Sequence, residues 1–335
     1  MMCPRSFVSL VILWDTAPEN CILLLNASLS FLIGAVFALI IPPEAELPYP
    51  YNFMSSFFGW TYFISWSASL YPAPLMTWMR GTADGLSVET RLITLIGYAC
   101  YATYNAMLLY STATRAEYLA ARGNYPEVKT NDLLYASHGA LLSIIVLIEM
   151  AYYSRREKTH KNECVSRTSL ILLSGLLVSI IILGALAAKG VVSLLEFAGL
   201  LANIELVANT VKYVPQLILN RQRKRTRGIH TTALRFQGAL LSIAQMFVDC
   251  LASRPVDWSG VVGDPVKFSL GFSSVFFDLI FFFQHYYLYR NATSTDNDNS
   301  TNTSNVVVAL PDSNDDRSPL LLIKNKESYG NLLAV

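Results

Sequence analysis

Seven apolar windows of about twenty residues dominate this sequence after residue 56. They lie at about 57–78, 92–113, 132–153, 169–190, 194–217, 233–253 and 266–289. A helix needs around twenty mostly apolar residues to cross a bilayer, where its backbone polar groups find no water to bind. Only 15% of the residues are charged, against roughly a quarter in soluble domains. The sequence therefore predicts an all-α membrane protein with seven transmembrane helices.

Basic residues gather in the loops that follow the first, third and fifth of these helices. These loops contain Arg80, Arg155, Arg156, Lys158, Lys161, Arg167, Arg221, Arg223, Lys224, Arg225 and Arg227. Short loops rich in lysine and arginine stay in the cytosol. We therefore expect the carboxyl end in the cytosol and the amino end in the lumen. Because the basic residues form short loop clusters and the formal net charge is only +1, nothing indicates a nucleic-acid partner.

A further apolar run at residues 21–41 precedes the seven windows. Residues 1–56 therefore hold either a signal sequence followed by a short lumenal segment, or an extra helix. A signal peptide fits a lumenal amino end, but Asp15 and Glu19 precede the run and only Arg5 supplies positive charge, which makes a poor signal-peptide start. We favour a signal sequence, cleaved or anchoring, and keep the eighth helix as the alternative.

The transmembrane domain, residues 57–290, contains an internal repeat. Pro72 and Pro215 are 143 residues apart, and so are Gly85 and Gly228. Two landmarks at one offset indicate a duplication. The copies cover about 57–153 and 194–289, and a connecting helix at 169–190 joins them. Because a single helix joins the copies, the two three-helix bundles have the same orientation in the membrane. Several transporters that bind substrate between their repeats share this arrangement.

Each repeat has a proline inside an apolar window. Proline lacks a backbone donor and clashes with the preceding turn, so it kinks or breaks a helix. We therefore expect hinges at Pro72 and Pro215, the alternative being static bends. In lipid the freed carbonyls must find partners or line a cavity, and the Gln216 amide is suited to that role.

Several ionisable residues fall at membrane depth, where charges are costly and face protein or water. Asp278, near the centre of its apolar helix, is the main candidate for carrying a proton. Asp132 opens the third helix, where it is either a second proton site or a helix cap. Glu205 and Lys212 lie two turns apart on one helix face and are expected to face one cavity. Arg235 begins the next helix, and we expect it to form an ion pair with Glu205.

Four segments in order resemble the cystinosin family of PQ-loop proteins, which transport cystine across lysosomal membranes. The segments are GWTYFISWSASLYPAPLMTW, VKYVPQLILN, GDPVKFSLG and FFDLIFFFQHYYLYR. The resemblance covers about residues 57–290. It implies the seven-helix fold, proton-coupled export of cystine to the cytosol, and a protein that uses no cofactor and catalyses no bond chemistry.

The resemblance also implies site residues. Substrate-site positions of the family match Asn105, Lys212, Tyr213, Gln216 and Asn220, and proton-coupling positions match Asp132 and Asp278. The chain departs from the family at four places: Ala73 replaces the first glutamine, Thr77 an asparagine, Glu205 a lysine and Arg235 an aspartate. The last two exchanges reverse two charges.

These departures leave three functions open. The first is a transporter of cystine, and the second is a transporter of a different amino acid, including a cationic one attracted by Glu205. The third is a receptor-like protein that keeps the fold without transport. An enzyme is not indicated, because the sequence has no nucleophile–base arrangement, no metal-ligand spacing and no phosphate loop.

Residues 291–335 are polar and of low complexity, which predicts a disordered cytosolic tail. It contains two patterns typical of signals that clathrin adaptors bind. Asp316 with Leu320 and Leu321 forms an acidic dileucine pattern, and Tyr329 with Leu332 forms a tyrosine pattern. Together with the family resemblance, they predict delivery to the lysosomal or vacuolar membrane.

Overall fold

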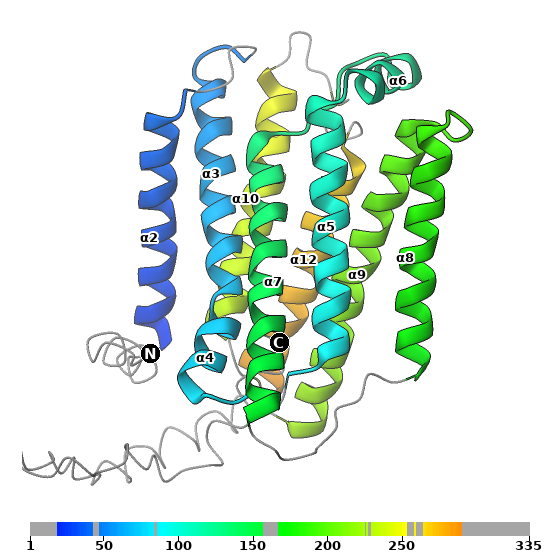
Figure 1. Ribbon diagram of the computed structural model, residues 1–335. Coiled ribbons are helices and arrows are strands. Elements are labelled where there is room, and N and C mark those ends of the chain that lie inside the picture. Colours follow the sequence, from blue (N-terminus) through cyan, green and yellow to red (C-terminus); the bar gives the residue numbers. More distant parts are fainter. Residues whose placement is uncertain are drawn as a thin grey trace, which may run out of the picture.

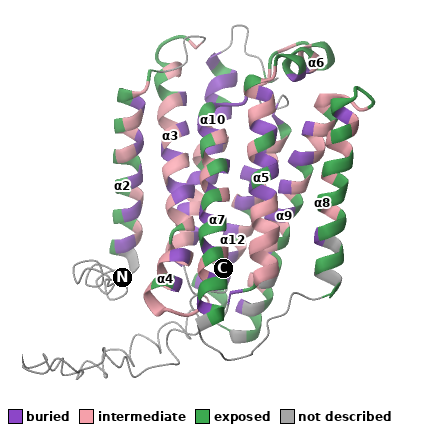
Figure 2. Ribbon diagram, viewed as in Figure 1, coloured by how far each residue is buried: buried purple, intermediate pink, exposed green. Residues whose placement is uncertain are grey.

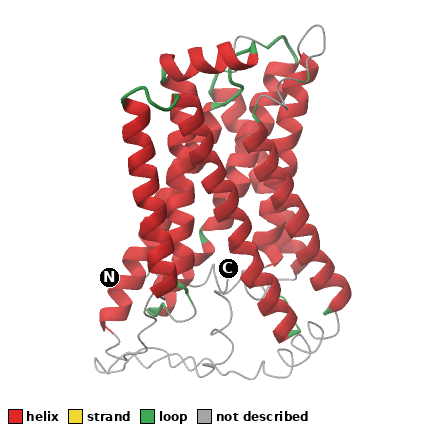
Figure 3. Ribbon diagram, turned by 90° about the vertical axis from the view of Figure 1, so that its right-hand side faces the viewer, coloured by secondary structure: helices red, strands yellow, loops and turns green. Residues whose placement is uncertain are grey.

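The computed structural model describes residues 19–42, 47–83, 86–156, 167–224, 226, 229–252, 258 and 264–289. Throughout these residues the regular elements are helices (Figure 3). They are α2 (Glu19–Ile40), α3 (Tyr51–Leu70), α4 (Pro72–Arg80), α5 (Val88–Tyr110), α6 (Thr112–Arg122), α7 (Thr130–Arg156), α8 (Arg167–Ala188), α9 (Leu194–Arg223), α10 (Ile229–Ala252), α12 (Pro265–Phe283) and the π-helical turn η1 (Gln284–Leu288). The long helices run side by side, and α6 lies across one end of the bundle (Figure 1). The predicted all-α class is confirmed.

Within the described residues, five helices are long and apolar enough to cross a membrane. These spans are Cys21–Ile40, Val88–Tyr110, Thr130–Arg155, Leu194–Gln222 and Pro265–Leu288, and α8 adds the shorter apolar stretch Leu173–Ala188. The other two predicted windows correspond to α3 with α4 and to α10. Both α3 and α10 bury polar residues, among them Ser65 and Gln245, and they pack against each other. Helices that face protein tolerate polar residues that lipid-facing helices do not.

The outside of the bundle is apolar. Helices α2 and α8 flank it on opposite sides and are largely exposed (Figure 2). Leu24 and Leu39 of α2 are 69% and 74% exposed, and Ile171 and Ile181 of α8 are each 69% exposed. Polar groups lie inside the bundle and large apolar side chains outside it, as expected when lipid surrounds the protein. The chain is a multi-pass membrane protein.

The two repeat prolines have different effects on their helices. Helix α3 ends at Leu70, and Pro72 occupies the first turn of the separate helix α4, so the first apolar window is two helices and not one. Pro215 lies within α9, which runs as one helix from Leu194 to Arg223. The expected break is therefore present in the first copy only. The hinge roles of both prolines remain predictions.

The ends of the helices bear on orientation. Helices α4, α7 and α9 end at Arg80, Arg156 and Arg223, all at the lower end of the bundle in Figure 1. This agrees with the prediction that the three basic loops lie on one side of the membrane. Helix α2 begins at that same end, and α12 runs down toward it (Figure 1). The predicted lumenal amino end therefore applies only to a chain from which α2 has been removed.

Helix α2 packs into the bundle through specific contacts. Ser30 is 3% exposed, and its Oγ accepts a hydrogen bond of 2.7 Å from Nε2 of Gln237 in α10. At Gly34 the helix approaches α3 so closely that an added Cβ would lie 2.8 Å from the Thr61 Cα. Small residues allow such close helix contacts in membranes. The signal sequence and the extra helix both remain predictions for residues 21–41.

This packing predicts that Gly34→Leu destabilises the protein. The leucine must push α2 away from α3, and overpacking of this kind costs about 1–3 kcal/mol. Gly175→Leu on α8 is the matched control, because an added Cβ there meets no atom within 4 Å. Thermal unfolding in detergent checks both variants. Equal melting temperatures for the two would show that α2 does not contribute to the folded bundle.

Candidate functional site

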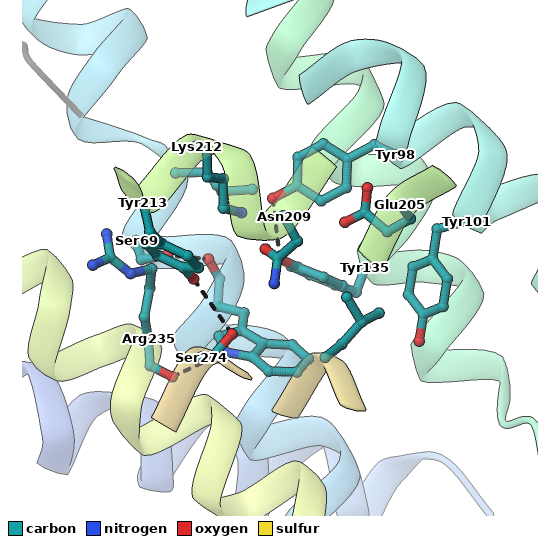
Figure 4. Close-up of a pocket in the computed structure, with 13 residues that line it drawn as sticks. Ser69, Tyr98, Tyr101, Tyr135, Glu205, Asn209, Lys212, Tyr213, Arg235 and Ser274 are labelled. Carbon is teal, nitrogen blue, oxygen red and sulfur yellow. Dashed lines mark hydrogen bonds between the residues drawn. The ribbon is translucent and has the colours of Figure 1, made fainter. Parts of the chain in front are cut away.

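A small cavity lies between the helices of the two predicted copies. Its walls come from α3, α5, α7, α9, α10 and α12, and the residues that line it are Trp66, Ser69, Leu70, Tyr98, Tyr101, Tyr135, Glu205, Asn209, Lys212, Tyr213, Arg235, Leu270 and Ser274 (Figure 4). Its volume is about 30 Å³, enough for a water or two at roughly 10–15 Å³ each. A space of this size is too small for an amino acid in this conformation.

Glu205 and Lys212 both reach this cavity from α9, as their spacing predicts. Glu205 is 5% exposed, and Gly97 of α5 leaves room for it, because an added Cβ there would collide with the Glu205 carboxylate. The Lys212 ammonium lies over the rings of Tyr98 and Tyr213, 5.8 and 5.3 Å from their centroids. Within the described residues neither charge has a salt-bridge partner within 4.0 Å. The cavity thus offers one free carboxylate and one free ammonium.

Arg235 binds Asp278, and the expected pair of Arg235 with Glu205 is wrong. Arg235 Nη2 lies 2.8 Å from Asp278 Oδ1 and Nε lies 3.3 Å from the same oxygen. The guanidinium also contacts the Tyr213 ring, 5.4 Å from its centroid. The physical reason is helix adjacency: α10 packs on α12, whereas Glu205 faces α5. Asp278 is 0% exposed and is the counter-ion of this arginine.

Asp132 forms a second buried ion pair. Its Oδ2 lies 3.0 Å from Lys267 Nζ and accepts the Lys129 backbone N–H at 3.0 Å, while Oδ1 accepts a hydrogen bond from the Tyr62 hydroxyl. Lys267 Nζ also donates to Gln245 Oε1 at 2.9 Å. Asp132 and Lys267 are each 2% exposed. Asp132 is therefore more than a helix cap, because it joins α7 to α12.

The remaining predicted substrate residues lie away from the cavity. Asn220 Nδ2 donates to Gln284 Oε1 at 3.0 Å, and Gln216 Nε2 donates to Asn220 Oδ1 at 3.4 Å. These amides tie the end of α9 to η1. Asn105 of α5 is 0% exposed and does not line the cavity. The tail residues Asp316, Leu320, Leu321, Tyr329 and Leu332 fall outside the residues that the structure describes.

Comparison of the sequence with those of known proteins places the chain in a family. A model described as "PQ loop repeat" matches twice, at residues 54–113 and 197–253. The chain is 34% identical over 245 residues to the "Cystinosin homolog" of Dictyostelium discoideum, covering 72% of this chain and 84% of that protein. The chain belongs to the cystinosin family.

Other relatives of the cystinosin family match over similar lengths. "Cystinosin" of Bos taurus is 32% identical over 247 residues, 71% of this chain and 64% of the bovine protein, so the chain spans less than two thirds of that relative. The "Cystine transporter" of Saccharomyces cerevisiae is 23% identical over 249 residues, 70% of this chain and 93% of the yeast protein.

Several residues of this cystinosin-family cavity were not singled out from the sequence. The aromatic wall of Trp66, Tyr98 and Tyr135 is made of residues that read as ordinary membrane aromatics. Lys267 was not singled out either. An Asp-Pro pair at a helix start, three residues ahead of it, was a signal that Lys267 lies in the first turn of α12, which here is buried.

Proposed function

We propose that this protein carries cystine or a related amino acid from the lumen of a lysosome-like compartment to the cytosol, driven by protons. The observation that carries the proposal is the cavity between the two predicted copies, which is lined by Glu205 and Lys212. Among the described residues neither of these side chains has a salt-bridge partner. Names such as cystinosin and cystine transporter among its relatives support it. They point to transport and away from enzyme catalysis.

The charges of the cavity suggest how an amino acid binds. Its ammonium pairs with Glu205 and its carboxylate with Lys212, since a buried charge must be paired to be tolerated. Arg235 is held by Asp278 and is not available to the substrate in this conformation. Because the cavity is too small for an amino acid, binding requires the helices to separate, and the break at Pro72 is a natural place for α3 and α4 to move.

Protons act on the buried ion pairs in this proposal. Protonation of Asp278 releases Arg235, and protonation of Asp132 releases Lys267. The first event frees Arg235 next to the cavity, and the second frees Lys267 between α7 and α12. The tail signals at Leu320, Leu321 and Tyr329 deliver the protein to the lysosome by binding clathrin adaptors.

Uptake at the cell surface tests the transport proposal. Changing Leu320, Leu321 and Tyr329 to alanine is expected to send the protein to the plasma membrane, where the lumenal side faces the medium. Labelled cystine and other amino acids are then offered in acidic and in neutral medium. We expect uptake that is faster in acidic medium. Absence of uptake of any amino acid by protein shown at the surface would support the receptor-like alternative.

A further inference from the structure

Five carboxylates of the described structure are almost completely buried. They are Asp132, Glu205, Asp249, Asp264 and Asp278, with exposed fractions of 2%, 5%, 8%, 1% and 0%. Three of them have a cation within 4.0 Å: Asp132 has Lys267, Asp249 has Lys129 and Asp278 has Arg235. Glu205 faces the cavity. Asp264 is the remaining buried carboxylate.

The two oxygens of Asp264 have different surroundings. Oδ1 accepts the backbone N–H of Lys267 at 3.1 Å, which caps the start of α12, and accepts the Tyr104 hydroxyl at 3.2 Å. Oδ2 is buried and has no hydrogen-bond partner among the described residues. An ionised oxygen left bare in the interior costs free energy, whereas a protonated one is better tolerated. The geometry therefore favours a proton on Oδ2.

Electrostatics point the same way. Asp264 lies one residue ahead of the span that begins at Pro265. Burial, and then the negative charge of Asp132, raise the pKa of Asp264 to about 6, although the backbone N–H and ammonium of Lys267 and the Tyr104 hydroxyl oppose the shift. A group with this pKa carries its proton in an acidic lumen and loses it near neutral pH.

The cluster around Asp264 draws on five helices. The titratable groups facing it are Tyr62 of α3, Tyr101 and Tyr104 of α5, Tyr118 of α6, Asp132 of α7 and Lys267 of α12. Among these groups Lys267 is the one cation, for two carboxylates. One proton on Asp264 makes the cluster neutral, and loss of that proton leaves two carboxylates competing for Lys267.

Tyr101 connects this cluster with the cavity. It lines the cavity and lies within electrostatic reach of both Asp132 and Asp264. Its ring stacks on that of Tyr104, with centroids 6.2 Å apart, and Tyr104 is hydrogen-bonded to Asp264. A change of charge at Asp264 therefore acts on a wall of the substrate site.

We propose that Asp264 carries a transported proton. Its Oδ2, which has no hydrogen-bond partner among the described residues, holds the proton while Lys267 is paired with Asp132. Release of that proton draws Lys267 away from Asp132. The proton enters from the acidic side and leaves to water on the opposite side, and no bond other than O–H forms or breaks. The inference rests on the proposed function for its transport step but not for the protonation itself.

Thermal unfolding tests the protonation independently of transport. The folded pKa of about 6 lies above the ordinary 3.8, so the folded state binds the proton more tightly and stability falls as pH rises between about 4 and about 6. Asp264→Asn removes this fall: we expect a smaller loss of melting temperature between about pH 5 and pH 7 than in the natural protein. Asp249→Asn, which breaks the pair with Lys129, is the control and is expected to lower the melting temperature at both pH values.

Uptake by the surface-directed protein tests the coupling. The ratio of uptake in acidic to neutral medium is expected to be lower in Asp264→Asn than in the unsubstituted surface protein. No uptake by the unsubstituted surface protein would overturn the proposed function and, with it, the transport step, while the melting comparison would still decide the protonation. An unchanged uptake ratio together with an unchanged pH dependence of melting would overturn the Asp264 inference alone.

Discussion

Arg235→Met is expected to destabilise the protein by about 3–5 kcal/mol, the usual cost of removing one partner of a buried ion pair. Asp278 is 0% exposed and has Arg235 as its cation at 2.8 Å. Methionine keeps much of the apolar length of the side chain but leaves the carboxylate buried without a counter-charge. Chemical or thermal unfolding in detergent measures the loss.

The pairing itself is tested by a second substitution. Adding Asp278→Asn to Arg235→Met removes the uncompensated charge, so the double variant is expected to recover much of the lost stability. Adding Glu205→Gln in its place is expected to recover nothing, since Glu205 does not contact Arg235. Recovery with Glu205→Gln and not with Asp278→Asn would contradict the observed pairing and restore the pair expected from the sequence.

Glu205→Gln is expected to weaken substrate uptake strongly while leaving the fold intact. If Glu205 binds the substrate ammonium, loss of that charge costs about 2–5 kcal/mol of binding, which is about 30-fold or more in apparent KM. The fold is spared because Glu205 has no salt-bridge partner among the described residues and the glutamine has nearly the same shape. Concentration-dependent uptake and melting of the same preparation measure the two effects.

Two further variants make this result specific. Lys212→Met is expected to raise KM in the same way, because Lys212 supplies the other charge. Glu196→Gln is the matched control: Glu196 lies on the same helix but belongs to the capping box at its start with Ser193, so KM is expected to stay unchanged. An equal KM for Glu205→Gln and Glu196→Gln would remove Glu205 from the substrate site.

The helices were largely predictable from the sequence, because a twenty-residue apolar run has few alternatives in a bilayer. The break before Pro72 followed from the chemistry of proline, but its absence at Pro215 did not, because whether a helix continues through a proline depends on its neighbours. The face shared by Glu205 and Lys212 was predictable from helix geometry alone.

The partners of the charges were not predictable in this way. Arg235 was assigned to Glu205 on the preceding helix, but α10 lies against α12, and Asp278 is therefore nearer. Lys267 and Asp132 are far apart in the sequence, yet they form a buried ion pair between α12 and α7. Periodicity gives the face on which a residue lies, and only the order of helices around the bundle decides what stands opposite.

The small size of the cavity bears on how the empty protein behaves. A space for a water or two is far smaller than an amino acid, so a substrate of that size enters only after the helices move apart. The same tight packing lowers the apparent affinity expected for such a substrate, because it binds only the fraction of molecules whose helices have moved apart.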